Sequence, residues 1–170
     1  SFPKRWKTAK VIPIPKTPSS SEITQQRPIS LLDSFSKLFE AVIHRVIQNH
    51  FGPLVSDQQH GFVAKRSTVT NLLGFTQDVS EALDSGFQVD CIYTDFAKAF
   101  DRVDHDILLR KLHESGFSRP LVALFASYLC DRTFRVSYDG HLSDLMSAKS
   151  GVPQGGNTGP DLFLFLINNL

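Results

Sequence analysis

The sequence predicts an α+β fold, and three observations lead to this prediction. Apolar residues recur at three- and four-residue spacing in several segments, which is the period of a helix packed on a core. Other short segments alternate apolar and polar residues, as strands do, and Gly- and Pro-rich loops separate the two kinds. With 170 residues, 41% of them hydrophobic and 21% charged, the chain can bury a core and differs from a disordered sequence.

Two long helices are predicted where helical spacing of apolar residues meets a capping signal. The first begins with Asp33 or Ser34 as its N-cap and stops at Gly52. The second opens near Ser67 and ends at Gly86. It is expected to bury five apolar residues: Val69, Leu72, Leu73, Val79 and Leu83.

Three shorter helices are predicted in the second half of the chain. Residues 105–115 form one that Gly116 closes, and Pro120 marks the start of another. Residues 150–160, "SGVPQGGNTGP", form a polar, Gly-rich loop. Pro160 suits the first turn of the last helix.

Strands are predicted in three segments. Residues 10–16, "KVIPIPK", alternate, but their two prolines restrict them to an edge strand or an extended segment, and a Ser/Thr/Pro loop follows to Gln26. Residues 133–148 are expected to form a β-hairpin that turns at 139–140, because Asp-Gly supplies the positive φ angles of a two-residue turn.

The third predicted strand, residues 87–94, leads directly into Asp95. A carboxylate held at a strand end points out of the sheet edge, where open sheets place ligands and metals. The alternative is an aspartate that caps a helix or a turn, as expected for Asp101, Asp104 and Asp106 around the next helix start. Spacing alone leaves both readings open for Asp95.

Other kinds of site do not fit the spacing. Residues 101–106, "DRVDHD", lack the glycine and distant glutamate of an EF-hand, the Gly-rich loop lacks the Lys-Ser/Thr of a P-loop, and no Gly-x-Ser-x-Gly motif positions a serine nucleophile. Cys91 and Cys130 lack the close pairing of a zinc site, so we expect them to be core thiols in a reducing compartment.

Charge and hydropathy set further limits. The formal net charge of +1 gives no global argument for a polyanionic partner, although five basic residues precede the first acid, Glu22. The longest apolar run, residues 162–167, is too short to span a bilayer, and no signal-peptide core opens the chain. From the lack of both segments we expect an intracellular chain. We also expect a fragment, since the sequence lacks an initiator Met and stops inside an amphipathic helix.

Five stretches taken together resemble one family, in their order and approximate spacing. They are "AKVIPIPK", "RPISLLDSFSKLFEAVI", "QHGFVAKRSTVTNLL", "YTDFAKAFDRVDHDILLRKL" and "SGVPQGGNTGPDLFLFLIN". They resemble the blocks of the reverse transcriptase of non-LTR (LINE-type, Jockey-like) retrotransposons, over nearly the whole chain. Group II intron and retron-like enzymes are near relatives, but "RPISL" and "SGVPQG" favour the LINE-type class.

The resemblance implies an α+β, right-hand polymerase fold made of fingers and a partial palm. Residues 1–85 would form fingers, 86–116 the first catalytic palm strand and helix, 117–149 a fingers-like helix and β-hairpin, and 150–170 an incomplete palm. The family's second catalytic block, Tyr-x-Asp-Asp, is expected after Leu170, so the chain is truncated before it.

The same resemblance implies that Asp95 is the first catalytic aspartate. It would bind two Mg²⁺ ions, with the main-chain carbonyl of Phe96 as a further ligand. Paired divalent ions suit nucleotidyl transfer, which depends on positioning and charge neutralisation. Because one carboxylate is too few for two dications, the isolated chain is expected to be inactive.

Substrate-binding roles are implied for five residues. Phe100 resembles the steric gate that excludes a ribose 2'-hydroxyl, with a core phenylalanine as the alternative. Arg27 and Lys16 resemble the residues that clasp the incoming triphosphate, although Lys16 could equally be a solvated lysine. Gln154 and Gly155 match the family's Pro-Gln-Gly motif, which lines the nucleotide and template pocket.

The expected partners are an RNA template, a DNA primer and deoxynucleoside triphosphates, with no membrane, in the nucleus and/or the cytoplasm. Lys65 and Arg66 are expected to touch the template backbone, with a solvated face as the alternative. Family members usually have Ser at Gly156 and an apolar residue at Asp161, and a buried charge is costly unless it is paired. A non-catalytic, nucleic-acid-binding remnant of a decayed element is therefore the alternative function.

Overall fold

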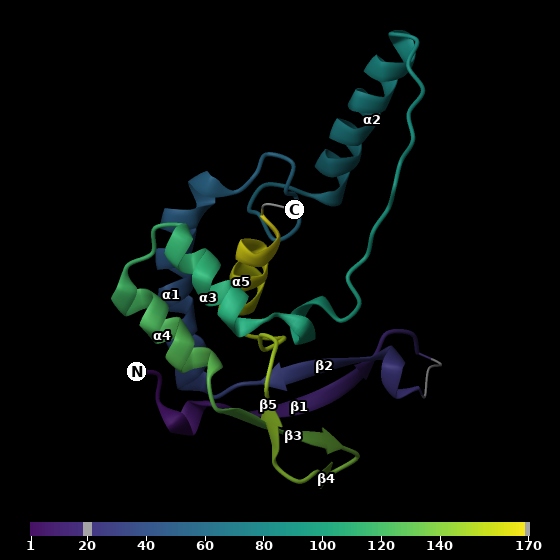
Figure 1. Cartoon of the computed structure of the whole chain (residues 1–170). Helices are drawn as coiled ribbons and strands as arrows, with labels where there is room; N and C mark the ends of the chain where they lie inside the picture. The colour runs from purple at the N-terminus through teal and green to yellow at the C-terminus, as the bar shows by residue number, and fades with distance from the viewer. Residues whose placement is uncertain (19–21, 169–170) are drawn as a thin grey trace.

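The computed structural model describes residues 1–18 and 22–168, and these residues form a mixed α/β fold. Figure 1 shows the sheet on one side of the molecule, helices α1, α3, α4 and α5 gathered on the other side, and helix α2 projecting away from both. Among the described residues, none of the helices has the length and apolar content that crossing a membrane requires.

One five-stranded sheet joins segments from both halves of the chain. Its strands are β1 (Thr8–Pro15), β2 (Gln26–Leu31), β3 (Arg132–Tyr138), β4 (His141–Leu142) and β5 (Met146–Ala148). The order is β2-β1-β3-β4, and β5 pairs with β3. β1 runs antiparallel to β2 and parallel to β3, so the N-terminal strand lies between its neighbour in sequence and a strand from the far half of the chain.

The prediction that residues 10–16 form an edge strand or an extended segment is wrong for part of the strand. Lys10 and Val11, in the first half of β1, have β2 on one side and β3 on the other. Pro13 and Pro15 lie in the second half, which is in register with β2 alone. The prolines therefore occupy the part of the strand that has one open side, where a missing N–H breaks no ladder bond.

The loop predicted to extend to Gln26 is interrupted by structure. Residues 19–21 lie outside the described residues, and a short 3₁₀ turn, η2 (Ile23–Gln25), leads directly into β2. β2 was not predicted, because a proline near its centre weakens the strand signal.

The two long helices begin where their caps predicted. Helix α1 (Ser34–Phe51) starts after Asp33, whose carboxylate accepts hydrogen bonds from the backbone N–H groups of Phe35 and Ser36. Helix α2 (Thr68–Asp84) starts after Ser67, which forms a reciprocal capping box with Thr70. These contacts satisfy N–H groups that have no partner inside the helix.

The expected burial of α2 is wrong. Leu72 and Leu73 are 63% and 64% exposed, and no residue of this helix is buried. Figure 1 shows why, because α2 projects beyond the other helices and only a chain segment without regular structure runs back beside it. Helical spacing identified an apolar face correctly, but the described residues cover little of it, with Tyr93 meeting Phe75 at 6.3 Å.

The strand predicted over 87–94 is also absent. Residues 87–96 have no helix or strand assignment, and Ile92 and Tyr93 are 90% and 83% exposed. A strand is stable only when a neighbour receives its backbone hydrogen bonds, and the described strands of the sheet pair elsewhere. The prediction that Cys91 and Cys130 are core thiols is wrong, because both are exposed. Cys91 lies on this irregular segment, and Cys130 is the residue directly after helix α4.

The predicted hairpin and the three shorter predicted helices are confirmed. Strands β3 and β4 form the hairpin and turn at Asp139 and Gly140, which both have positive φ. Helix α3 (His105–Glu114) is followed by Gly116 at φ 85°, helix α4 (Arg119–Leu129) has its proline in the first turn, and helix α5 (Thr158–Ile167) follows the Gly-rich loop. Three 3₁₀ turns complete the described fold: η1 (Lys4–Trp6), η3 (Gly52–Leu54) and η4 (Ala99–Arg102).

The hydrophobic core lies between α1, α3, α4 and α5. Each helix contributes side chains that are almost completely shielded from solvent. They include Ile47, Leu108, Leu112, Leu129, Leu162 and Leu164. Burying one such side chain contributes about 1.5–3 kcal/mol, so this cluster fixes the position of α5, the helix that follows the Gly-rich loop.

Asp161 is charged and buried in this core, but it is paired. It is only 2% exposed, and its two carboxylate oxygens lie 2.6 Å from His44 Nδ1 and 2.6 Å from Gln48 Nε2. Both partners belong to α1, so the pair joins α1 to α5. Burial raises the pKa of Asp161, although the hydrogen bonds from His44 and Gln48 oppose this effect. An aspartate at position 161, where the family pattern has an apolar residue, is therefore stabilised by its hydrogen bonds to His44 and Gln48.

The substitution Asp161→Asn removes the ionisable group and keeps its size. Because the folded state raises the pKa of Asp161, the folded protein holds this proton more tightly than the unfolded chain does. The wild-type free energy of unfolding should therefore fall relative to that of Asp161→Asn as pH rises above about 4, the ordinary aspartate value. Urea unfolding at several pH values measures the difference.

The exposed residue Asp106 provides the control, because Asp106→Asn removes one carboxylate from the surface and not from the core. A constant difference between wild type and Asp161→Asn at every pH would contradict the raised pKa of Asp161.

Candidate functional site

The Gly-rich loop is bonded along its backbone to the turn that carries Phe100. The N–H of Val152 donates to the carbonyl of Phe100 at 2.8 Å, and the N–H of Gly151 donates to the carbonyl of Val103 at 2.8 Å. The hydroxyl of Ser150 donates to the carbonyl of Asp101 at 3.0 Å. These bonds join two segments about fifty positions apart, so Phe100 and the loop form one unit.

Close approach of the two backbones requires glycine at position 151. Gly151 has φ 85°, and a Cβ atom added there would lie 2.8 Å from the carbonyl oxygens of Phe100 and Asp101. Any other residue would push the loop away from η4.

The other side of the loop is bonded to the sheet. The N–H of Ser30, on β2, donates to the carbonyl of Gln154 at 2.7 Å. Gly155 has φ 115°, and a Cβ atom there would lie 2.8 Å from the carbonyl oxygen of Ser30. The close approach predicted for Gly155 is therefore present, and it is an approach to β2.

A cavity of about 390 Å³ opens between the sheet and the loop. Its walls include Ser30 from β2, Asp101 from η4 and Gln154 from the loop. The amide nitrogen of Gln154 donates to Oδ1 of Asp101 at 3.0 Å across this space. The cavity combines apolar walls with several polar side chains, among them the two cations Arg132 and Lys149. Small-molecule sites likewise place polar groups on partly apolar walls.

Phe100 lies in an aromatic cluster at the edge of the core. It is half-buried, its ring lies 5.0 Å from that of Phe163 at 30°, and the ring of Phe62 meets it edge-on at 5.8 Å. Phe96 contacts Phe163 in turn, at 6.2 Å. Packing of this kind holds the Phe100 ring in one place, which both a gate and a core phenylalanine require.

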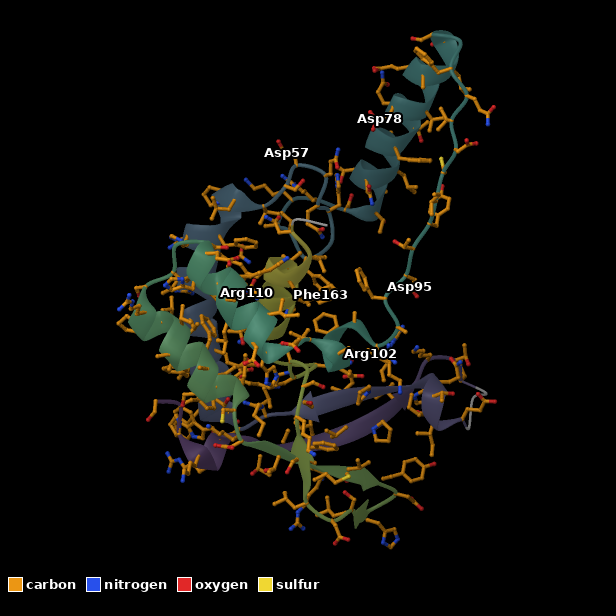
Figure 2. All side chains as sticks on the ribbon, viewed as in Figure 1. Asp57, Asp78, Asp95, Arg102, Arg110 and Phe163 are labelled. Carbon is orange, nitrogen blue, oxygen red and sulfur yellow. The ribbon has the colours of Figure 1, made fainter. Side chains whose placement is uncertain are left out.

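Asp95 lies on the segment without regular structure, not at a strand end. Figure 2 shows it on the extended run that leads from α2 to η4, where Arg102 is labelled. Its side chain is exposed, and within residues 1–18 and 22–168 no hydrogen bond or ion pair engages its carboxylate. The carboxylate is therefore open to a ligand, and its predicted role in metal binding stays a prediction.

The described residues do not make a metal site by themselves. No group of three or more His, Cys, Asp or Glu side chains in this part of the chain is arranged to hold a metal ion. Asp95 and the carbonyl of Phe96 offer hard oxygen atoms of the kind that Mg²⁺ prefers, but one carboxylate is not a complete site.

Lys16 and Arg27 lie together at the end of the β1–β2 hairpin where the connecting segment joins the two strands. Arg27 is in register with Ile14, and the N–H of Lys16 donates to the carbonyl of Gln25 at 2.9 Å. Both side chains are exposed. Arg27 is three residues from Ser30, where the loop is bonded, so its Cα lies roughly 10 Å away along the strand.

Lys65 and Arg66 have different surroundings. Lys65 is exposed and has φ 66°. Arg66 donates to the carbonyls of Ser56, Asp57 and Gln59 and forms a 3.0 Å ion pair with the Asp57 carboxylate. Arg66 therefore holds the preceding loop together, whatever else it contacts.

Sequence reasoning missed two carboxylates that shape the site. Asp101 was expected to cap a helix or a turn. It lies in the first turn of η4, and the cap of α3 is Asp104, whose Oδ1 accepts from the N–H of Ile107 at 2.9 Å. Glu40 was not singled out, because it falls within the helical pattern of α1. Neither role could be read from spacing, because each partner lies far away in the chain.

Glu40 is a buried anchor for the end of the Gly-rich loop. It is 1% exposed, and its oxygens accept from the hydroxyls of Ser36 at 3.3 Å and Tyr128 at 3.1 Å and from the N–H of Asn157 at 2.9 Å. Its negative charge and burial raise the pKa of Tyr128, burial being the larger cause. A Cβ atom at Gly156 would lie 2.5 Å from Glu40 Oε2, which explains glycine at this position.

Comparison with known proteins gives a consistent result. The profile of the family described as "Reverse transcriptase (RNA-dependent DNA polymerase)" matches residues 14–170. The "Probable RNA-directed DNA polymerase from transposon BS" of Drosophila melanogaster is 36% identical over 95% of this chain and 18% of its own length. The "RNA-directed DNA polymerase from mobile element jockey" of the same species is 34% identical over 99% of this chain and 19% of its own length.

A more distant relative extends the comparison. The "Retrovirus-related Pol polyprotein from type-1 retrotransposable element R2" of Popillia japonica is 23% identical over 99% of this chain and 24% of its own length. The chain thus spans about a fifth of the length of the curated relatives it matches.

The substitution Gly156→Ala tests the anchor at Glu40. The added methyl group has no room beside the Glu40 carboxylate, so we expect a loss of about 1–3 kcal/mol in the free energy of unfolding. Gly74→Ala is the matched control, because an added Cβ meets nothing within 4 Å on α2 and should raise stability by about 0.5–1 kcal/mol. Urea unfolding gives the free energy of unfolding of both variants. If Gly156→Ala is as stable as Gly74→Ala, the Glu40 side chain can move aside without loss of stability.

Proposed function

The chain belongs to the reverse transcriptase (RNA-dependent DNA polymerase) family, and from this membership we propose that it is the fingers and first palm part of an RNA-directed DNA polymerase of a non-LTR retrotransposon. The parent protein would extend a DNA primer on an RNA template by nucleotidyl transfer. Support comes from relatives whose names describe this activity. The matches cover nearly all of the present chain.

One observation of the structure carries the proposal. The Gly-rich loop is bonded on one side to β2, which carries Arg27, and on the other side to η4, which carries Phe100. Three stretches that are widely separated in sequence therefore converge on one cavity, with Gln154 on its wall. A site that binds a nucleotide needs such convergence, because base, sugar and phosphates are recognised by different groups.

The proposed division into subdomains follows the family pattern. Residues 1–85 would belong to the fingers, 86–116 to the palm, 117–149 to the fingers again, and 150–170 to the palm, of which the last two residues lie outside the described part. The mixed α/β fold is compatible with this division. In the parent protein, residues 87–94 would become a palm strand once a neighbouring strand receives their hydrogen bonds.

Asp95 is proposed as one ligand of a Mg²⁺ site, together with the carbonyl of Phe96. A divalent ion would neutralise charge on the phosphates and activate the primer hydroxyl when it is bound. The exposed and unpaired carboxylate of Asp95 supports this role, and the further carboxylates are proposed to come from the parent protein. For this reason the chain by itself is proposed to be inactive.

Nucleotide binding is proposed to use Gln154, which lies on the cavity wall, and residues on segments next to that wall. Arg27 and Lys16, exposed at the connected end of the hairpin, would hold the triphosphate, because a guanidinium can bind two phosphate oxygens at once. Phe100 would exclude a 2'-hydroxyl, and its packing against Phe163 supports a fixed ring. Gln154, with Gly155 bringing the loop to β2, would contact the nucleotide.

Contacts with the template are proposed for Lys65, whose side chain is exposed. For Arg66 we propose an indirect part, since its guanidinium already holds residues 56–59 and would keep Lys65 in place. An intracellular location, in the nucleus and/or the cytoplasm, is proposed from the need for RNA and DNA substrates.

A non-catalytic, nucleic-acid-binding remnant is the second candidate. It gains less support from the structure than from the sequence, because the charge at Asp161, which suggested decay, is paired with His44 and Gln48.

The substitution Asp95→Asn tests catalysis. In the parent protein that contains this chain, we expect primer extension on an RNA template to fall by about a hundredfold or more, because a metal ligand is lost. The matched control is Asp90→Asn, an exposed aspartate on the same segment, which should extend primers at the wild-type rate. Equal activity of wild type and Asp95→Asn would refute the assignment, and an inactive wild type that still binds RNA would favour the remnant.

The substitution Phe100→Val tests the gate. A smaller side chain makes room for a 2'-hydroxyl, so the parent protein should incorporate ribonucleotides about tenfold more readily relative to deoxynucleotides. Phe62→Val is the control, since it disturbs the same aromatic cluster from the other side. Gel analysis of single-nucleotide incorporation gives the ratio. If sugar selectivity stays unchanged in Phe100→Val, or changes as much in Phe62→Val, Phe100 is a packing residue.

A further inference from the structure

Asp101 is held so that its side chain faces the cavity. Its N–H donates to the carbonyl of Lys98 at 3.0 Å, and its carbonyl accepts from the hydroxyl of Ser150. The residue is half-buried, and it lines the cavity together with Gln154. With the main chain fixed on both sides, the carboxylate has little freedom except about its own two bonds.

The contact with Gln154 determines which way its amide points. Nε2 of Gln154 donates to Oδ1 of Asp101 at 3.0 Å. An ionised carboxylate can only accept hydrogen bonds, so the amide nitrogen must face Asp101 and the amide oxygen must face away. In the described residues no donor is bonded to that oxygen, so it remains available as an acceptor.

We propose that Asp101 is a positioning residue, which fixes the Gln154 amide so that its oxygen is presented to the ligand of the cavity. This inference rests on the proposed function, in which Gln154 contacts the nucleotide. The group on the ligand that meets this oxygen must be a donor, such as a hydroxyl or an amino group. A phosphate oxygen, which accepts, cannot be its partner.

Other roles for Asp101 fit the structure less well. It does not cap α3, because Asp104 does so. It is not part of a cluster that could hold a metal ion in the described part of the chain. It forms no ion pair with the cations of that part either, so Gln154 is the partner that its carboxylate serves.

The substitution Asp101→Asn separates orientation from packing. Asparagine has the same shape, but it can offer either an oxygen or an N–H₂ group to Gln154, so the amide is no longer forced into one orientation. A residue with only a packing role would tolerate this change. Asp106→Asn is the matched control, because it removes the same charge from an exposed site five residues away.

The first experiment uses the 170-residue chain and needs no activity. The side-chain amide protons of Gln154 are followed by ¹⁵N-resolved NMR while the pH is lowered until aspartates protonate. In wild type and in Asp106→Asn, the Gln154 amide signals should shift as Asp101 loses its charge, and in Asp101→Asn this shift should vanish. Identical titration of the Gln154 amide in all three proteins would overturn the proposal.

The second experiment uses the parent protein in steady-state primer extension. Asp101→Asn should raise the KM for the deoxynucleotide about tenfold, the cost of one lost charged hydrogen bond, with kcat nearly unchanged. In a Gln154→Ala background the same substitution should have no further effect, because Asp101 acts through Gln154. An effect of equal size in that background, or a fall in kcat alone, would overturn the proposal.

Together the two experiments distinguish a failure of the proposed function from a failure of the positioning role of Asp101. A parent protein that extends no primer contradicts the proposed function, and the NMR titration then still decides whether Asp101 orients Gln154. An active parent protein in which Asp101→Asn behaves as wild type contradicts the positioning role and leaves the proposed function standing.

Discussion

The fold around the candidate site depends on the backbone hydrogen bonds that the Gly-rich loop makes on its two sides. On one side Ser30 binds the carbonyl of Gln154, and on the other Val152 binds the carbonyl of Phe100. Glycines at 151 and 155 allow the three backbones to come this close. Because main-chain atoms make these bonds, the loop holds the sheet and η4 in a fixed relation, and side chains other than those at the two glycine positions remain free to serve a ligand.

Buried carboxylates fix the far end of the same loop and the helix that follows it. Glu40 accepts from the N–H of Asn157, and Asp161 is held by His44 and Gln48 one turn further along α1. Helix α1 thus binds α5 through polar contacts as well as through apolar packing. A buried charge is tolerated here because its oxygens are hydrogen-bonded, and each contact specifies one register between the two helices.

Local signals in the sequence predicted the local structure, and what failed depended on distant partners. The caps at Asp33 and Ser67 and the turn at Asp139 follow from chemistry within a few residues, and they are present. The strand over 87–94 was predicted from alternation, which shows that a segment can form a strand but not that a neighbour exists.

The candidate site divides in the same way. A resemblance identified Phe100 and Gln154, and the structure places them on segments that are bonded together. The resemblance did not identify Asp101 or Glu40, whose hydrogen-bond partners Gln154 and Asn157 lie 53 and 117 positions away in the sequence. Polar contacts over such separations have no periodicity and no fixed spacing, so they become visible only in the folded chain.

The parallel pairing of β1 with β3 has a consequence for how the chain folds. Thr8 and Thr133, whose hydroxyls lie 3.0 Å apart, are separated by 125 positions. On the ribosome the first strand is therefore made long before its central partner, and until then the side of β1 that β3 will cover is an unpaired edge. Because a loop of this length must close before β1 and β3 can pair, the parallel pairing is expected to form late in folding.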